Sequence, residues 1–289
     1  MDRSEVRRLW HCLEHLNAVT YFAEECREAN RTAGLRGFWM GYFASRAAPL
    51  GPVGPGVVHA LFFNFAPSMI QRSIPDAWRF AEPVTILELR QRSAASALRR
   101  IIPDVADVAE SVLDDLAISV VTAPGSGRAL FCVNRDVERP PDPVEALWQS
   151  ATALREHRGD GHTALLTSKG LSGCEPHVLF ASEGGIPREV LQSNRGWSDE
   201  EWVEAQRRLQ ERGLYNGATL TSAGHRLRAD IEQATDELAG RAYDAIGPGG
   251  VKSLIDLLIE PARCISRSGD IPYPNPIGLP PIDLCPQEP

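Results

Sequence analysis

The sequence predicts a mainly α-helical fold made of two similar units packed around a central pocket. Apolar residues recur at helical spacing through most of the chain, which is the pattern of amphipathic helices. A glycine motif also recurs, as Gly-Leu-Arg-Gly at 34–37 and Gly-Leu-Ser-Gly at 170–173, and Phe-Ala-Ser follows each copy. Two similar units packed face to face would enclose a pocket at their seam, where ligand sites are common.

The repeat and the proline-rich stretches divide the chain into four parts. We expect an N-terminal helical repeat unit over 1–138, a linker over 139–143, a C-terminal repeat unit over 144–260 and a proline-rich tail over 261–289. The prolines after residue 270 exclude a helix there and favour polyproline II. The tail is expected to lie along the body or to fray, and capping the mouth of the pocket is a third alternative.

In the first unit, the periodicity predicts a long helix over 5–32 with a break near Asn17. Further helices are expected over 57–65, 69–72, 83–102 and 105–116. Two apolar runs, 118–123 and 128–133, flank a Pro-Gly-Ser-Gly turn and favour a hairpin. Extension of the preceding helix through the first of these runs is the alternative.

The second unit is expected to begin with a long helix from Pro143 to about residue 156. Two glycines in the Gly-Asp-Gly sequence at 159–161 predict that this helix breaks there. Shorter helices are expected near 162–169, 174–183 and 187–194.

Clear capping signals mark the rest of the second unit. Ser198 and Glu201 form a capping box at the start of a helix that ends before Gly213. Asn-Gly at 216–217 predicts a tight turn between two short extended runs. Thr221 then caps a helix over 222–239.

Residues 174–239 resemble the winged-helix half of MarR-type regulators. The resemblance lies in Arg-Gly-Leu at 212–214, the Asn-Gly turn, and Leu-Thr-Ser-Ala-Gly-His at 220–225 before a long helix. Over its whole length the chain is similar to an actinobacterial family labelled helix-turn-helix, through the stretches 37–43, 48–55 and 154–162. These resemblances imply two pseudo-repeated winged-helix-like units with small β-wings, and they imply no catalytic role.

Charge and composition disfavour several classes of function. The chain has 30 basic and 38 acidic residues, a net charge of −8, which disfavours binding to nucleic acid. No apolar run reaches the roughly 18 residues of a membrane helix, and the charged N-terminus lacks the apolar core of a secretory signal. We therefore expect a cytoplasmic protein. The six cysteines form no Cys-x-x-Cys pair and are expected to be buried.

The expected recognition helix, 199–212, is also unsuited to DNA. Its N-terminal part, which a winged helix presents to the major groove, carries the four carboxylates Asp199, Glu200, Glu201 and Glu204. The wing has no Arg or Lys between 214 and 223. Three arginines late in the helix are left for contacts to a DNA backbone: Arg207, Arg208 and Arg212. DNA is therefore not the expected partner.

A dense polar cluster, His-Arg-Gly-Asp-Gly-His at 157–162, is the main candidate for chemistry. The glycines would let the backbone bring His157, Asp160 and His162 together at the helix break. Such a set can form an acid–base pair or a 2-His-1-carboxylate metal site. The structural alternative is that Asp160 caps the next helix. We predict all three as catalytic residues, assign no metal, and leave the cofactor unknown.

The corresponding stretch of the first unit supplies the remaining candidates. Tyr21 is expected to approach the same seam and is the fourth predicted catalytic residue. Residues expected to bind a ligand are Phe22, Trp39, Tyr42, Arg46 and Arg158. The alternative for the aromatic residues is a place in the core, because aromatic side chains dominate core packing.

These patterns favour a cytoplasmic protein of specialised metabolism that handles a small molecule in the pocket between the two units. It would be an enzyme that performs acid–base chemistry on a small organic substrate, or a binding protein. The alternative is a MarR-like transcriptional regulator that senses a ligand. Association into a homodimer is left open.

Overall fold

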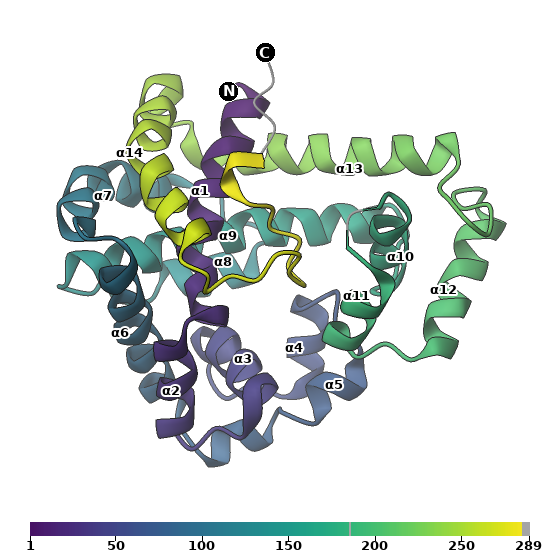
Figure 1. Cartoon of the computed structure of the whole chain (residues 1–289), viewed down its shortest axis with the longest axis horizontal. Helices are drawn as coiled ribbons and strands as arrows, with labels where there is room; N and C mark the ends of the chain where they lie inside the picture. Colours follow the sequence, from purple (N-terminus) through teal and green to yellow (C-terminus); the bar gives the residue numbers. More distant parts are fainter. Residues whose placement is uncertain (185, 285–289) are drawn as a thin grey trace.

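Helices make up almost all of the regular structure. The computed structural model describes residues 1–184 and 186–284, and in that range the chain forms fourteen α-helices and no β-strand. The extended backbone there pairs only at an isolated antiparallel bridge between Tyr215 and Leu220. The prediction of a mainly helical fold is confirmed (Figure 1). The expected wing in the second unit is a tight turn closed by that bridge.

Eight helices form the N-terminal half of the chain. They are α1 (Arg3–Phe22), α2 (Glu24–Thr32), α3 (Gly37–Ala47), α4 (Pro55–Leu61), α5 (Pro67–Gln71), α6 (Pro83–Ile101), α7 (Val105–Thr122) and α8 (Ala129–Arg135). The predicted 5–32 helix breaks at the extended residue Ala23 rather than near Asn17. The predicted hairpin over 118–133 is wrong, because its two apolar runs lie in the helices α7 and α8, which bury Leu116 and Phe131 respectively. The alternative, extension of the preceding helix through the first run, is correct.

Six helices follow. They are α9 (Pro143–Ser168), α10 (Glu175–Ser182), α11 (Arg188–Arg195), α12 (Asp199–Glu211), α13 (Ser222–Gly240) and α14 (Gly247–Arg267). The capping box of Ser198 and Glu201 is confirmed. The cap of α13 is confirmed as well, because the Thr221 hydroxyl accepts a hydrogen bond from the backbone N–H of Gly224.

Helix α9 runs without interruption through the glycines that were expected to break it. A Cβ atom placed on Gly161 would lie 2.7 Å from Nη1 of Arg128. Gly161 therefore allows a buried guanidinium to approach the helix closely, where Arg128 donates hydrogen bonds to the carbonyls of His157 and Leu238. The predicted break is wrong because this glycine serves a packing contact, not a turn.

The recurring Gly-Leu motif marks the ends of helices. Gly34 and Gly170 both adopt positive φ, 80° and 65°, directly after α2 and α9. In each case the following leucine N–H bonds a carbonyl five residues earlier, at Asn30 and Leu166 respectively. This is the Schellman arrangement, and it occurs a third time at Gly213. The recurrence thus has a local explanation that does not require a duplication.

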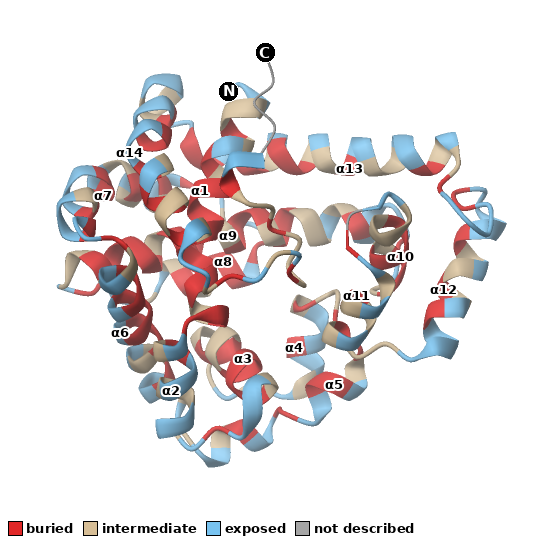
Figure 2. Cartoon of the chain, in the orientation of Figure 1, coloured by how far each residue is buried: buried red, intermediate tan, exposed pale blue. Residues whose placement is uncertain are grey.

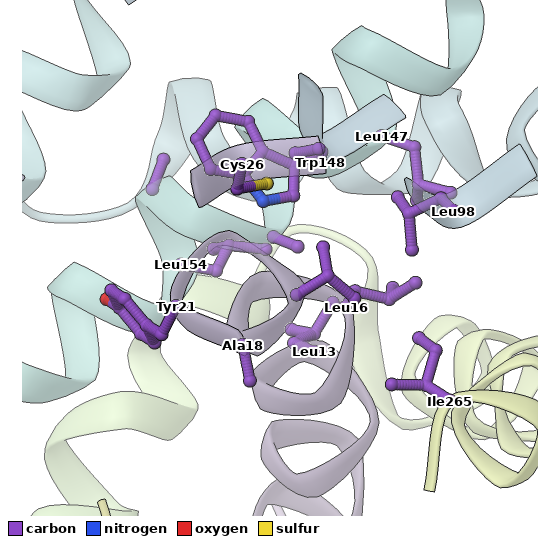
Figure 3. Packing of buried hydrophobic residues seen from close by; sticks show 14 of the residues in the cluster. Leu13, Leu16, Ala18, Tyr21, Cys26, Leu98, Leu147, Trp148, Leu154 and Ile265 are labelled. Carbon is purple, nitrogen blue, oxygen red and sulfur yellow. The ribbon is translucent and has the colours of Figure 1, made fainter. Parts of the chain in front are cut away.

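The larger hydrophobic core joins the two ends of the described chain. Helix α1 lies against α9, α14 and α6, and its residues Leu9, Leu13 and Leu16 are almost fully buried. Trp148 of α9 and Ile265 of α14 belong to the same cluster (Figure 3), and Figure 2 shows buried positions in red along α1 and α9. Each such side chain contributes about 1.5–3 kcal/mol to stability.

A second, smaller core lies beneath α10, α11, α12 and α13. Among its buried members are Leu171, Leu179, Leu191, Trp202 and Ile231. Residues on both sides of the expected 139–143 linker belong to the larger core, since α9 packs on α7 and α8. The buried residues of the larger core thus lie before about residue 160 and after about residue 235, and those of the smaller core lie between these two points.

The C-terminal segment returns across the body. Helix α14 continues through Pro261 to Arg267, so the helix extends past the expected start of the tail at residue 261. Residues 268–284, which we call the strap, then cross the middle of the molecule (yellow in Figure 1). The remaining predicted tail, 285–289, lies outside the described residues. No described helix combines the length and apolarity required to cross a membrane.

Candidate functional site

A cavity of about 480 Å³ lies between the two hydrophobic cores. Its walls come from α1, α9, α10, α11 and α13, together with Asn64 and residues of the strap between Pro276 and Pro280. One wall is apolar and belongs to the smaller core: Leu166, Leu171, Leu179, Phe180, Leu191 and Ile231. The opposite wall is charged. A site with this division can hold a molecule that has a polar end and an apolar end.

Arginines dominate the charged wall, and four of them form ion pairs. Arg158 Nη1 lies 2.6 Å from Asp236 Oδ1, and Arg7 Nη2 lies 2.6 Å from the other oxygen of the same carboxylate. Arg155 contacts Glu14 of α1 and its own neighbour Glu156. Arg228 of α13 lies 2.5 Å from Glu183. The wall is thus built from pairs that cross between helices.

The fifth arginine of the cavity, Arg195 at the end of α11, has no carboxylate partner among residues 1–184 and 186–284. Its side chain donates to two backbone carbonyls, Pro276 O at 2.6 Å and Asn194 O at 3.3 Å. The carbon of its guanidinium also lies 4.6 Å from the ring centre of Phe65. Burial lowers the pKa of Arg195.

Three buried polar atoms of cavity-lining residues have no hydrogen-bond partner within the described part of the chain. They are Arg195 Nε, Asn64 Oδ1 and His11 Nδ1. Burial lowers the pKa of His11 to about 3, so its ring is neutral near pH 7. Because buried polar groups are nearly always paired, these atoms leave hydrogen-bonding capacity unused in residues that line the cavity.

Two of the predicted site residues lie in the cavity wall. His162 faces α13, where its Nδ1 is 3.0 Å from the hydroxyl of Thr235. Arg158 is buried, and its guanidinium carbon lies 4.4 Å from the ring centre of Trp10. Burial lowers the pKa of His162.

His157 and Asp160 lie on another face of α9, toward α8. The His157 ring packs edge-on against Phe131 at 4.9 Å, and burial lowers its pKa to about 3. Asp160 Oδ2 accepts the backbone N–H of Phe131 at 2.9 Å, in the first turn of α8, and burial raises its pKa to about 6. The uninterrupted helix therefore separates these two residues from His162. No group of three His, Cys, Asp or Glu residues in the described ranges is placed to hold a metal ion.

Of the predicted residues of the first unit, Tyr21 and Tyr42 line a smaller cavity of about 190 Å³, whereas Phe22, Trp39 and Arg46 line neither cavity. Figure 3 shows Tyr21 at the edge of the main core, its hydroxyl directed away from the labelled leucines. Burial raises the pKa of Tyr21 to about 12. Phe22 packs on Tyr21, and Trp39 packs in an aromatic cluster with Phe43 and Phe65.

A chain of buried polar groups links the two cavities. The Tyr42 hydroxyl accepts a bond of 3.4 Å from Arg46, which also holds Glu156 through two bonds of 2.8 and 2.9 Å. Glu156 in turn pairs with Arg155, which lines the larger cavity. The two arginines hold the pKa of Glu156 at about 2 despite its burial. Arg46 is thus placed between the cavities.

Several cavity residues were not predicted from the sequence: His11, Glu14, Asn64 and Arg195. His11 and Glu14 follow Arg7 at helical spacing on α1, so an unusually polar stripe on a buried helix was the available signal. Asn64 and Arg195 lie in or beside loops, and no local pattern distinguishes them.

Comparison with known proteins gives one match. A family model described as a helix-turn-helix family matches residues 6–272 of the chain. Neither a curated protein nor a solved structure matches.

Proposed function

This chain belongs to the helix-turn-helix family whose model matches residues 6–272, and we propose a function for it from the cavity that its own fold forms. The proposed function is to bind a small molecule in the cavity between α1 and α9 on one side and α10, α11 and α13 on the other. The observation that carries this proposal is the set of unpaired buried polar atoms at Arg195, Asn64 and His11.

Size and composition support the same proposal. Ligand pockets usually have volumes of about 300–1,000 Å³ and combine apolar walls with a few placed polar groups. The cavity of about 480 Å³ has both features. Of the residues predicted to be catalytic, His162 lines this cavity, so acid–base chemistry here would use His162 first. Tyr21 would belong to the smaller cavity.

Native mass spectrometry of the intact protein tests the proposal. We expect an added mass that is released on denaturation and that is reduced in Ile231→Trp, which fills the apolar wall. Val203→Trp is the matched control, because Val203 is exposed on α12 and does not line the cavity. Circular dichroism confirms folding of both variants. Equal occupancy of the two variants, or no bound mass and no binding from a metabolite library, would contradict the proposal.

A second candidate is a regulator that couples this cavity to DNA. The family match supports it, as does the order of α10, α11, α12, the bridged turn and α13, which is the order of a winged-helix unit. Helix α13 also lines the cavity through Arg228, Ile231 and Thr235. A ligand there would contact the helix that follows the wing.

The charges on α12 count against the second candidate. Arg207 is paired with Glu204 and Glu211, and Arg212 donates to the carbonyls of Lys169 and Gly170. These side chains would have to leave their partners to contact phosphate. A gel-shift titration against DNA upstream of the coding sequence, at low and moderate salt, distinguishes the two candidates. Salt-sensitive nanomolar binding that responds to a cavity ligand would favour the regulator.

A further inference from the structure

We infer that the cavity takes an organic acid with one carboxylate and an apolar body, and that Arg195 binds the carboxylate. This inference rests on the proposed function and identifies the chemical class of the ligand. It depends on the charge balance of the cavity, the surroundings of Arg195 and the apolar wall that adjoins it.

The ion pairs around the cavity leave Arg195 as the arginine without an acid. Arg7 and Arg158 share Glu232 and Asp236, and Arg228 pairs with Glu183. Arg155 and Arg46 share Glu14 and Glu156. One further negative charge would therefore balance the described groups around the cavity. A carboxylate supplies one charge, whereas a phosphate monoester near pH 7 would bring an excess.

Arg195 is buried in a way that makes this imbalance costly. The residue is 8% exposed, lines the cavity, and keeps one donor, Nε, without a partner. Its two other bonds go to neutral carbonyls, at Asn194 and Pro276. A buried charge is normally paired, and a guanidinium is suited to bind a carboxylate through two parallel bonds.

The apolar wall sets the rest of the ligand. Leu171, Leu179, Leu191 and Ile231 line the cavity and are at least nine-tenths buried members of the smaller core. Arg195 belongs to the same helix as Leu191, so the acid-binding group and the apolar wall adjoin. A molecule that places its acid on Arg195 would therefore rest its body on these side chains.

Matched pairs of acids and amides test the inference by isothermal titration calorimetry. We would use benzoate with benzamide, 2-naphthoate with 2-naphthamide, and octanoate with octanamide. The unmodified protein should bind the acid of at least one pair about tenfold more tightly than its amide, since bonds to a charged group contribute about 1.5–3 kcal/mol. This comparison needs no variant.

Arg195→Gln should abolish the preference for the acid and leave affinity for the amide within about twofold. Arg228→Gln is the control, because Arg228 lines the same cavity but has Glu183 as its partner. It should keep the preference. Circular dichroism checks that both variants fold.

The outcomes separate the inference from the proposed function. Acids and amides that bind equally well, or a preference that survives in Arg195→Gln, would overturn the carboxylate site while leaving a small-molecule cavity. Absence of binding by every acid and amide would overturn the ligand class. If native mass spectrometry then still showed a bound mass, the proposed function would stand without it.

Discussion

Replacing each of the two glycines of α9 by alanine should change stability in opposite directions. Gly159 and Gly161 both lie inside the continuous helix with ordinary helical backbone. A Cβ on Gly159 would meet Glu156 Oε2 at 3.5 Å, an ordinary contact, whereas a Cβ on Gly161 would meet Arg128 Nη1 at 2.7 Å. The two positions thus differ in the space available and not in backbone geometry.

The magnitudes follow from this difference. Alanine is about 1 kcal/mol more favourable than glycine inside a helix, so Gly159→Ala should raise the free energy of unfolding by about that amount. In Gly161→Ala the guanidinium of Arg128 must move and lose its bonds to the carbonyls of His157 and Leu238. Loss of bonds from a charged donor costs about 1.5–3 kcal/mol, which exceeds the gain. We expect a net loss of about 0.5–2 kcal/mol.

Urea unfolding followed by circular dichroism measures both changes under the same conditions. A flexible break at 159–161 would make both substitutions destabilising. A Gly161→Ala variant as stable as the unmodified protein would refute the close approach of Arg128 as the reason for this glycine. The two variants together therefore test the continuity of α9 as well as its packing.

Three further predictions concern the buried polar groups of α9. Asp160 has a pKa raised to about 6, so its own contribution to stability rises by about 1 kcal/mol as pH falls from 7.5 to 5, whereas His11 and His157, with pKa values of about 3, lower stability over the same range. Asp160→Asn should remove the favourable contribution, so that the variant loses about 1 kcal/mol more on acidification than the unmodified protein in urea unfolding. An unchanged pH profile would contradict it. His157→Ala should lower the free energy of unfolding by about 2–3 kcal/mol, because the ring is packed on Phe131, and should leave ligand affinity in calorimetry unchanged. A variant with intact stability and lost affinity would instead support the predicted catalytic role of His157. Arg158→Met should cost about 3 kcal/mol in thermal unfolding, since buried Asp236 would keep only Arg7, and a loss below about 1 kcal/mol would show that this pair is not structural.

Local signals in the sequence predicted local structure well. The capping box of Ser198, the cap at Thr221 and the proline start of α9 depend on residues within one turn of the helix end. The sequence therefore places α9, α12 and α13 with correct starting points. The Gly-Leu motif was also recognised, and in the structure each copy ends a helix, which accounts for the motif without requiring a duplicated unit.

The errors have a common cause in contacts between distant segments. Gly161 is explained by Arg128, which lies elsewhere in the chain, and the second run of the expected hairpin is helical, with Leu130 and Phe131 buried in α8, which packs against α9. The same cause explains which residues of the candidate site could be predicted. His162 and Arg158 were identified because they lie in a dense polar sequence, whereas Arg195 is distinctive only through the absence of a described acid beside it. Such an absence is a property of the folded chain.

The strap is the last segment of the cavity wall to be synthesised. Pro276, Ile277 and Gly278 form part of its wall, and Arg195 binds the carbonyl of Pro276. These residues leave the ribosome only after every other contributor to the cavity has been synthesised. A small molecule present during translation therefore meets a site that still lacks one wall. The same molecule added to the finished protein meets the assembled cavity, so the order of addition becomes an experimental variable in its own right.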